Sequence, residues 1–258
     1  MIARTALANA LQQYCNYSHF LHAYWYQQLG NSAKNPSILG FIDKHMLLSA
    51  ICDFGCPSAS EGLEPGDSFV GSAPISWFSC DYPILRPPAY DESPPTQLFI
   101  PGSHRCKFMD GVLVHWNFEA KSVTIAPLQI TIAASPSPSD TLFMENNWAG
   151  MVDLLSRWKI NARFVWIMEK RDGPIKVTKV PSAYSVTTRG ASTRQLHPAY
   201  SSITLSVIDV NKKIGSSLLD MRVEAANAAK IKTSPLLPAC VVCACVDLRV
   251  CYHVCVRL

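Results

Sequence analysis

Residues 105–120, RCKFMDGVLVHWNFEA, decide the fold class. Within them, apolar side chains recur at every second position, which is the period of a β-strand. The apolar face of this strand carries Val112, Val114, Trp116 and Phe118. The positions between them are Leu113, His115, Asn117 and Glu119. The alternation predicts a strand over 109–119 with one clearly apolar face.

Further strands are expected on both sides of this segment. Val123 and Ile125 are in phase with each other, but the apolar positions 128, 130 and 132 beyond Pro127 are shifted by one, which indicates a bulge or bend at the proline. The run ARFVWIM (162–168) is apolar on both faces and predicts a central strand. The turn Asp172-Gly173-Pro174 follows it.

Two more strands are predicted near the end of this region. One spans 203–210, where positions 203, 205 and 207 are apolar. In the other, over 217–225, Leu219, Met221 and Val223 alternate with charged residues. About eight short strands separated by proline-rich loops (82–95 and 135–140) are typical of an antiparallel sandwich or barrel.

Helical spacing of apolar residues occurs in three places. Residues 3–29 predict one or two amphipathic helices, 41–51 (FIDKHMLLSAI) a short helix, and 146–158 a helix within a connection. The expected organisation is an N-terminal helical and loop extension (1–66), a β-sandwich (67–232) and a C-terminal extended arm (233–258).

The composition limits the function classes. The 258 residues are 48% hydrophobic and only 16% charged, against roughly 25% charged in an ordinary soluble domain. Such a chain hides surface against partners. No apolar run reaches the ~18 residues that a membrane helix needs, so no membrane anchor is expected. The net charge of +4 comes without a cluster of Lys and Arg, so RNA binding by the isolated chain should be weak and strongly salt-dependent.

The cysteine-rich tail, 240–258, alternates strictly over fifteen residues. Val and other apolar residues occupy one parity, and Cys243, Cys245, Cys251 and Cys255 occupy the other. We expect an extended strand at 241–257 that pairs with a sheet edge, either of this subunit or of a neighbouring one. A zinc site is a weaker alternative, because too few residues separate the cysteine pairs for the chain to fold back.

No sequence pattern indicates catalytic, cofactor-binding or metal-binding residues. The chain has no phosphate-binding glycine loop, no G-x-S-x-G and no H-E-x-x-H. Cys106 beside His104 could suggest a thiol hydrolase, but a nucleophile and its base usually come from separate elements. The ten cysteines are expected to be reduced thiols.

Two segments carry a resemblance to a known family. Residues 105–120 resemble the strand entry of the small coat proteins of picorna-like viruses. The pair 203–213 and 216–226 resembles the last two strands of the comovirus-like coat jelly roll, with Asn211, Met221 and Arg222 at the matching places. The resemblance covers about residues 68–230 and implies an eight-stranded antiparallel jelly-roll sandwich that tiles an icosahedral shell.

The expected function is therefore that of a structural capsid subunit and not of an enzyme. Its partners would be other capsid subunits, with weak contact to genomic RNA, in a virion assembled in the host cytoplasm. The alternatives are a cellular β-sandwich that binds carbohydrate or protein and, less favoured, a thiol hydrolase.

Overall fold

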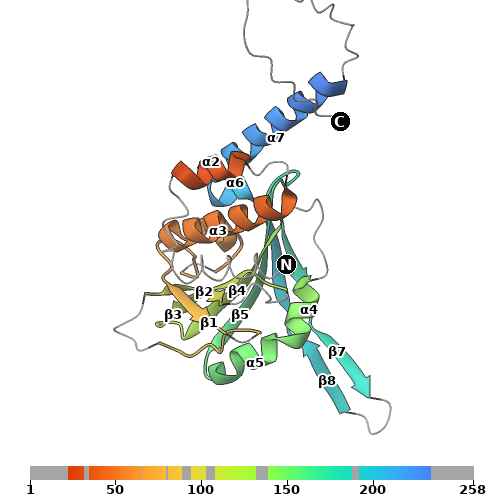
Figure 1. The fold of residues 1–258 in the computed structure, drawn as a ribbon. Helices are drawn as coiled ribbons and strands as arrows, with labels where there is room; N and C mark the ends of the chain where they lie inside the picture. Colours follow the sequence, from red (N-terminus) through yellow and green to blue (C-terminus); the bar gives the residue numbers. More distant parts are fainter. Residues whose placement is uncertain are drawn as a thin grey trace, which may run out of the picture.

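One mixed β-sheet forms the middle layer of the protein, and helices cover both of its faces (Figure 1). The computed structural model describes residues 23–31, 35–64, 66–79, 81–88, 94–102, 108–131, 139–187 and 192–233. The strands are β1 (Ile75–Phe78), β2 (Thr96–Pro101), β3 (Gly111–Asn117), β4 (Ser122–Thr131), β5 (Lys159–Met168), β6 (Val177–Val180), β7 (Ala183–Thr187), β8 (Ser192–His197) and β9 (Tyr200–Ser206). The helices are α2 (Ala23–Asn31), α3 (Pro36–Phe54), α4 (Ser139–Asn146), α5 (Trp148–Val152), α6 (Val207–Val210) and α7 (Lys212–Thr233), with 3-10 turns at Pro57–Ser60 (η2) and Asp153–Leu155 (η3).

The seven strands of the main sheet lie in the order β1-β2-β3-β4-β5-β9-β6. β2, β3 and β4 form an antiparallel meander, whereas the pairs β1–β2, β4–β5 and β5–β9 are parallel. β6 closes the far edge antiparallel to β9. A parallel pair needs a crossover connection, and α4 with α5 supplies the one between β4 and β5.

Two apolar cores lie on opposite faces of this sheet. On the first face, α3, α6 and α7 pack against side chains that include Leu113, Leu128, Val165 and Ile203. On the second face, α4 and α5 pack against side chains that include Val114, Ile125 and Phe164. The central strands are therefore buried on both faces, as is usual where helices cover a sheet from both sides.

β4 contributes to both cores without any break in its register. Every residue of β3 from Gly111 to Asn117 pairs in step with β4, straight past Pro127. Val123 and Ile125 face the α4–α5 core, and Ala126, Leu128 and Ile130 face the α3 core. The expected bulge at Pro127 is wrong: Ser122–Leu128 are buried on both faces of the strand, and only the apolar side chains change from one face to the other along an unbroken register.

The segment predicted as a strand at 217–225 is part of helix α7, which is a correction. The large apolar residues that the described part of α7 buries are Ile214, Leu218 and Met221, at the spacing of a helix face, while Leu219 and Val223 are exposed. The alternation of Leu219, Met221 and Val223 is therefore incidental. Likewise, the strand expected at 203–210 ends at Ser206, where a capping box starts α6.

The chain is rich in strands, as expected, and β3, β5 and β9 occupy the predicted segments. The helix expected within 146–158 is present as α5 and η3, and the one expected at 41–51 is the longer α3. The mixed seven-stranded sheet, with the separate β7–β8 pair, does not match the two packed antiparallel sheets of a jelly roll. A strand that is buried on both faces has the same apolar pattern whether a second sheet or a helix covers it, so the pattern did not distinguish them.

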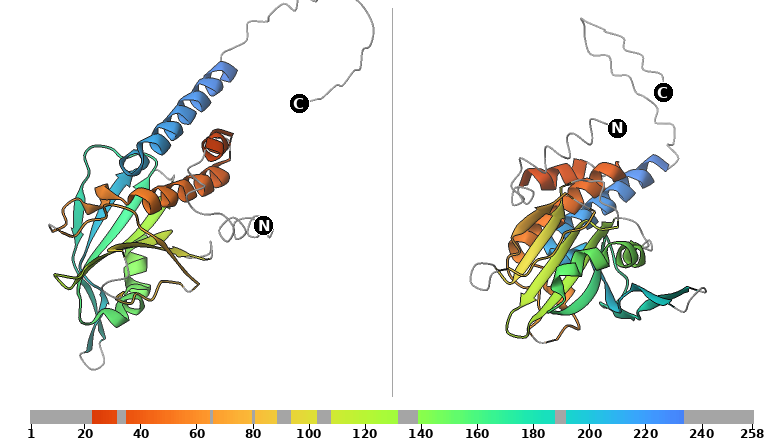
Figure 2. Two further views of the ribbon diagram at one scale, coloured as in Figure 1. Left: turned by 90° about the vertical axis from the view of Figure 1, so that its left-hand side faces the viewer. Right: turned by 90° about the horizontal axis from the view of Figure 1, so that it is seen from below.

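α3 lies within residues 1–66, the segment expected as an N-terminal helical and loop extension, and it shares one core with the sheet. α7 extends from the body beside α2, where the Lys213 ammonium lies 4.3 Å from the centre of the Tyr26 ring. The β7–β8 hairpin extends away from the main sheet (Figure 2). None of the described helices combines the length and apolar character needed to cross a membrane. The tail at 234–258 and the predicted helix before residue 23 lie outside the described residues.

Candidate functional site

Charged side chains gather at one end of the sheet, where the parallel strands β4 and β5 end. We call this end the carboxyl edge. Because these strands run in the same direction, their carboxyl ends, Thr131 and Met168, are neighbours. Asp110 precedes β3, which is antiparallel to β4, so Asp110 reaches the same edge. Ligands of open α/β sheets bind most often outside the carboxyl ends of the strands. This edge is therefore the first place to look for a functional site.

The Asp110 carboxylate is the centre of the group. Its Oδ1 pairs with the Lys44 Nζ of α3 at 2.8 Å. Its Oδ2 accepts hydrogen bonds from the Gln129 side-chain Nε2 at 2.9 Å and from the Ile130 backbone N–H at 2.7 Å. The carboxylate is thereby fixed in direction, and it fixes Lys44 in turn. We call Lys44, Asp110 and Gln129 the carboxyl-edge cluster.

The hydrogen-bonding capacity left over in this cluster is of donor type. Both Asp110 oxygens already accept hydrogen bonds, whereas Lys44 has three N–H groups and Asp110 is its only partner among the described residues. The Lys44 side chain is 19% exposed, so solvent or a ligand reaches it. An acceptor-rich, anionic group complements such a site better than a cation does.

Next to Lys44 on α3, Asp43 is buried, and neither of its carboxyl oxygens has a hydrogen-bond partner. Burial, with a smaller contribution from the charge of Glu169 at the end of β5, raises the pKa of Asp43 to about 7. On the other side of Lys44, burial and then the Lys44 charge lower the pKa of His45 to about 3, so this ring is neutral. Asp43 therefore changes its charge near neutral pH.

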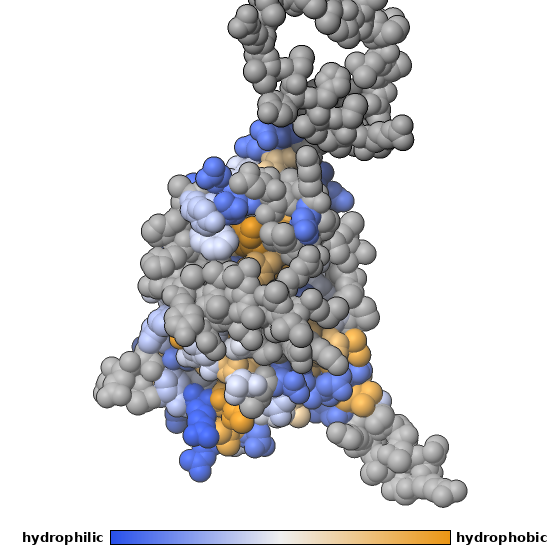
Figure 3. Space-filling view, viewed as in Figure 1, coloured by the Kyte–Doolittle hydropathy of each residue, from blue (hydrophilic) through white to orange (hydrophobic). Residues whose placement is uncertain are grey.

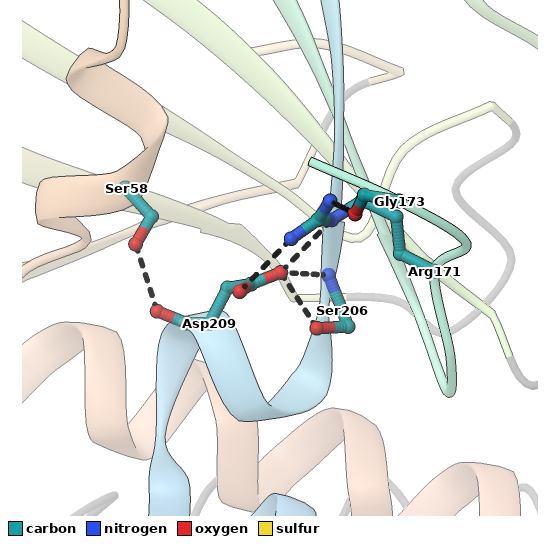
Figure 4. Close-up of polar contacts among 5 residues, drawn as sticks. All are labelled: Ser58, Arg171, Gly173, Ser206 and Asp209. Atoms are coloured by element: carbon teal, nitrogen blue, oxygen red, sulfur yellow. Dashed lines mark hydrogen bonds and ion pairs between the residues drawn. The ribbon is translucent and has the colours of Figure 1, made fainter. Parts of the chain in front are cut away.

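A second charged group holds the end of β5 to α6 (Figure 4). Arg171 donates from Nε to Asp209 Oδ2 at 3.2 Å and from Nη2 to Oδ1 at 3.3 Å. Asp209 also accepts from the Ser206 backbone N–H and hydroxyl, and its own carbonyl accepts from the Ser58 hydroxyl. Burial would raise the Asp209 pKa, but the hydrogen bonds from Arg171 and Ser206 outweigh it and lower that pKa. All these groups satisfy one another, so we regard this network as structural.

The thiol chemistry considered from the sequence finds no support in the described cysteines. Cys56 is fully buried, and burial raises its pKa to about 12, so it has almost no thiolate at neutral pH. Burial also raises the pKa of Cys52. Cys106, His104 and the cysteines of the tail lie outside the described residues. Within the described ranges, no three His, Cys, Asp or Glu side chains are grouped so as to hold a metal ion.

Sequence reasoning missed the carboxyl-edge cluster because its members are far apart in the chain. One signal was available: Asp43 and Lys44 interrupt the otherwise apolar run FIDKHMLLSAI. Charged residues inside an apolar helix have to be paired or functional. Comparison of the chain with protein-family models, curated proteins and solved structures finds no match.

Proposed function

We propose that this chain is a ligand-binding α/β domain that recognises a phosphate-bearing ligand at the carboxyl-edge cluster. The observation behind the proposal is that Lys44 has unused N–H groups while its ammonium is held in a fixed direction by Asp110 at the carboxyl edge. Gln129, which is half-buried beside it, can add an amide contact. The proposal concerns binding and includes no covalent step.

The charges around the cluster are compatible with an anion. Lys44 and Asp110 neutralise each other, and Asp43 is about half protonated at neutral pH. A bound phosphate would place its oxygens against the free N–H groups of Lys44 and away from the Asp110 oxygens, which are already occupied. Hydrogen bonds between charged partners contribute about 1.5–3 kcal/mol each.

The test is a binding titration of the full chain with three probes: inorganic phosphate, a mononucleotide and a short nucleic-acid duplex. The probes separate a free phosphate group from a nucleotide and from a polymer. Lys44→Met should lower the affinity for the tightest-binding probe by at least about tenfold, since about 1.4 kcal/mol corresponds to one order of magnitude in affinity. Lys159→Met is the matched control, because Lys159 is exposed at the opposite edge of the sheet. Equal affinities for the Lys44→Met variant and the unchanged chain would rule the site out.

As a second candidate, we propose that the chain is a structural capsid subunit that assembles with sister subunits around an RNA genome. Three observations favour assembly: the low charge content, the exposed apolar side chains of α7, and Tyr24 of α2, which is 59% exposed. A shell subunit with this fold would contact its neighbours through its helices and sheet edges. A jelly-roll subunit would need a different arrangement of the strands. It would be found in the virion, after assembly in the host cytoplasm.

The face seen in Figure 3 bears on this candidate. Where described residues are drawn, its apolar patches are small and separated by polar residues. Negative-stain microscopy and light scattering of the purified full chain would test assembly directly. Leu219→Glu with Val223→Glu should then disrupt the particles. If the chain is a monomer at all concentrations and its binding at Lys44 is intact, the capsid proposal is ruled out and only the ligand-binding proposal remains.

A further inference from the structure

A pocket of about 480 Å³ opens at the opposite edge of the sheet, where β5 and β9 begin. The strand register explains its position. β9 pairs with β5 only from Arg163 onward, so Lys159–Asn161 have β4 on one side and no β9 residue on the other. The missing length of β9 leaves a notch between β5 and the end of β6. Pockets of 300–1,000 Å³ are of the size that small molecules occupy.

The wall of the notch is mostly apolar and contains one buried cation. Leu63, Ile160 and Val180 supply apolar surface, and the polar groups come from Asn161, Ser201 and the oppositely charged, exposed Lys179 and Glu64. The cation is Arg163, which lines the pocket although the residue is only 1% exposed. An apolar cavity with few converging polar groups is the usual form of a small-molecule site.

The Arg163 guanidinium uses only part of its hydrogen-bonding capacity. Its Nη1 donates to the backbone carbonyls of Ala59 and Glu61 at 2.5 and 2.7 Å, and its Nε donates to the Ser201 hydroxyl at 3.1 Å. The two N–H groups on Nη2 have no hydrogen-bond partner among the described residues. Nη2 is also absent from the fully buried unpartnered atoms, so this nitrogen keeps a small accessible surface, and Arg163 lines the pocket.

The charge of Arg163 is also unpaired within the described part of the chain, where no carboxylate forms an ion pair with it. Glu61 acts on it only through its charge at longer range. The Asp67 carboxylate accepts from Asn161, another residue of the pocket lining, at 2.8 Å. A buried cation without a counter-charge is costly, and burial lowers the Arg163 pKa accordingly. An anion in the pocket would remove this cost.

We propose that the notch at the start of β5 and β9 binds a small carboxylate with an aliphatic body. The carboxylate accepts hydrogen bonds from Nη2 of Arg163, which is the buried cation of the pocket, while the exposed charges of Lys179 and Glu64 in the lining are of opposite sign. The aliphatic body lies against Leu63, Ile160 and Val180. A phosphate dianion fits less well, because the apolar walls would strip its water. This site is separate from the carboxyl-edge cluster and does not rest on the function proposed there.

The experiment is a titration of the full chain with octanoate, octanol and octylamine, which share one aliphatic body and differ in charge. Octanoate should bind saturably and at least about tenfold more tightly than octanol, and octylamine should bind most weakly. Equal binding of octanoate and octanol, or no saturable binding of octanoate, would overturn the proposal. Because Lys44 lies at the other edge of the sheet, Lys44→Met should leave octanoate binding unchanged.

Two variants locate the binding in the notch. Ala199 is exposed and lines the pocket, so Ala199→Trp fills it without disturbing the core and should abolish octanoate binding. Lys176→Ala is the matched control, since Lys176 is an exposed residue outside the pocket lining, just before β6. Arg163→Met is informative only if circular dichroism shows an intact fold, because Arg163 also holds the turn at Ala59. Unchanged octanoate affinity in Ala199→Trp would show that the notch is not the site.

Discussion

Leu218 and Leu219 are neighbours in the sequence and lie on opposite sides of α7, with 1% and 42% of their surfaces exposed. Leu218 packs into the α3 core with Ile214 and Met221, one helical turn away on either side. This relationship distinguishes a helix from the strand that the sequence predicts at 217–225, in which Leu219 and Met221 would share the buried face.

Leu218→Ala should destabilise the protein far more than Leu219→Ala. Burial of Leu218 predicts a loss of about 2–5 kcal/mol in the free energy of unfolding, as for other Leu-to-Ala changes in cores. Because Leu219 is exposed, Leu219→Ala should lower the free energy of unfolding by at most about 0.5 kcal/mol. Urea denaturation of both variants gives the comparison. A larger loss for Leu219→Ala would mean that this segment is not the helix described.

Asp43→Asn should stabilise the protein at neutral and alkaline pH. Because the folded-state pKa of Asp43 is about 7, against an ordinary 3.8, the folded protein holds a proton that the unfolded chain releases between these values. The contribution of Asp43 to stability is therefore full below about pH 4 and is lost as the pH rises towards 7. A difference of one in pKa corresponds to about 1.4 kcal/mol, so Asp43→Asn should raise the free energy of unfolding by a few kcal/mol.

Thermal unfolding of Asp43→Asn and of the unchanged chain from pH 4 to pH 8 measures this difference. The stability advantage of the variant should grow with pH and level off above pH 7. Asp172→Asn, at an exposed turn, is the control and should show no such trend. A constant difference across the pH range would mean that Asp43 is ionised throughout.

Gly55→Ala should be much more destabilising than Gly71→Ala. Both glycines have a positive φ, +74° and +86°, so an alanine at either site adopts a conformation that costs about 1–2 kcal/mol. At Gly55 the added methyl group would also meet the backbone carbonyl oxygens of Phe69 and Gly71, whereas at Gly71 it would meet open space. Chemical denaturation measures both, and equal losses would show that φ alone accounts for the effect.

Cys52 should be alkylated by iodoacetamide faster than Cys56 in the folded protein. Cys56 is fully buried and its pKa is about 12, whereas Cys52 is only half-buried. Cleavage before Asp53 places the two cysteines on separate peptides, so mass spectrometry can follow each one. In denaturant the two rates should become equal, which shows that the fold and not the local sequence protects Cys56. Faster labelling of Cys56 in the native protein would contradict its burial.

The strands were predictable where period two or an unbroken apolar run was strong, as in β3 and β5. What covers them was not, because β5 has the same apolar residues under helices as it would under a second sheet. α7 was missed because Leu219, Met221 and Val223 have a chance alternation that hides the helical spacing of Ile214, Leu218 and Met221.

The candidate sites depend on tertiary contacts that no local pattern contains. Lys44 and Asp110 are brought together only because α3 crosses the sheet near the start of β3. Arg163 was predicted as part of a central strand, but its incomplete pairing depends on where β9 begins. Pairing registers between distant strands therefore place both sites, and registers are set by the whole fold.

The continuous course of β4 through both cores has a consequence for how the protein opens. One half of this strand is held by the α3 layer and the other half by the α4–α5 layer, so neither layer can detach without loosening the same backbone ladder. The two layers should therefore open as one cooperative unit, and the amide hydrogens of β4 and β5 should exchange with solvent only through global unfolding. The edge strands β1 and β6, each paired on one side only, should exchange through local fraying long before that.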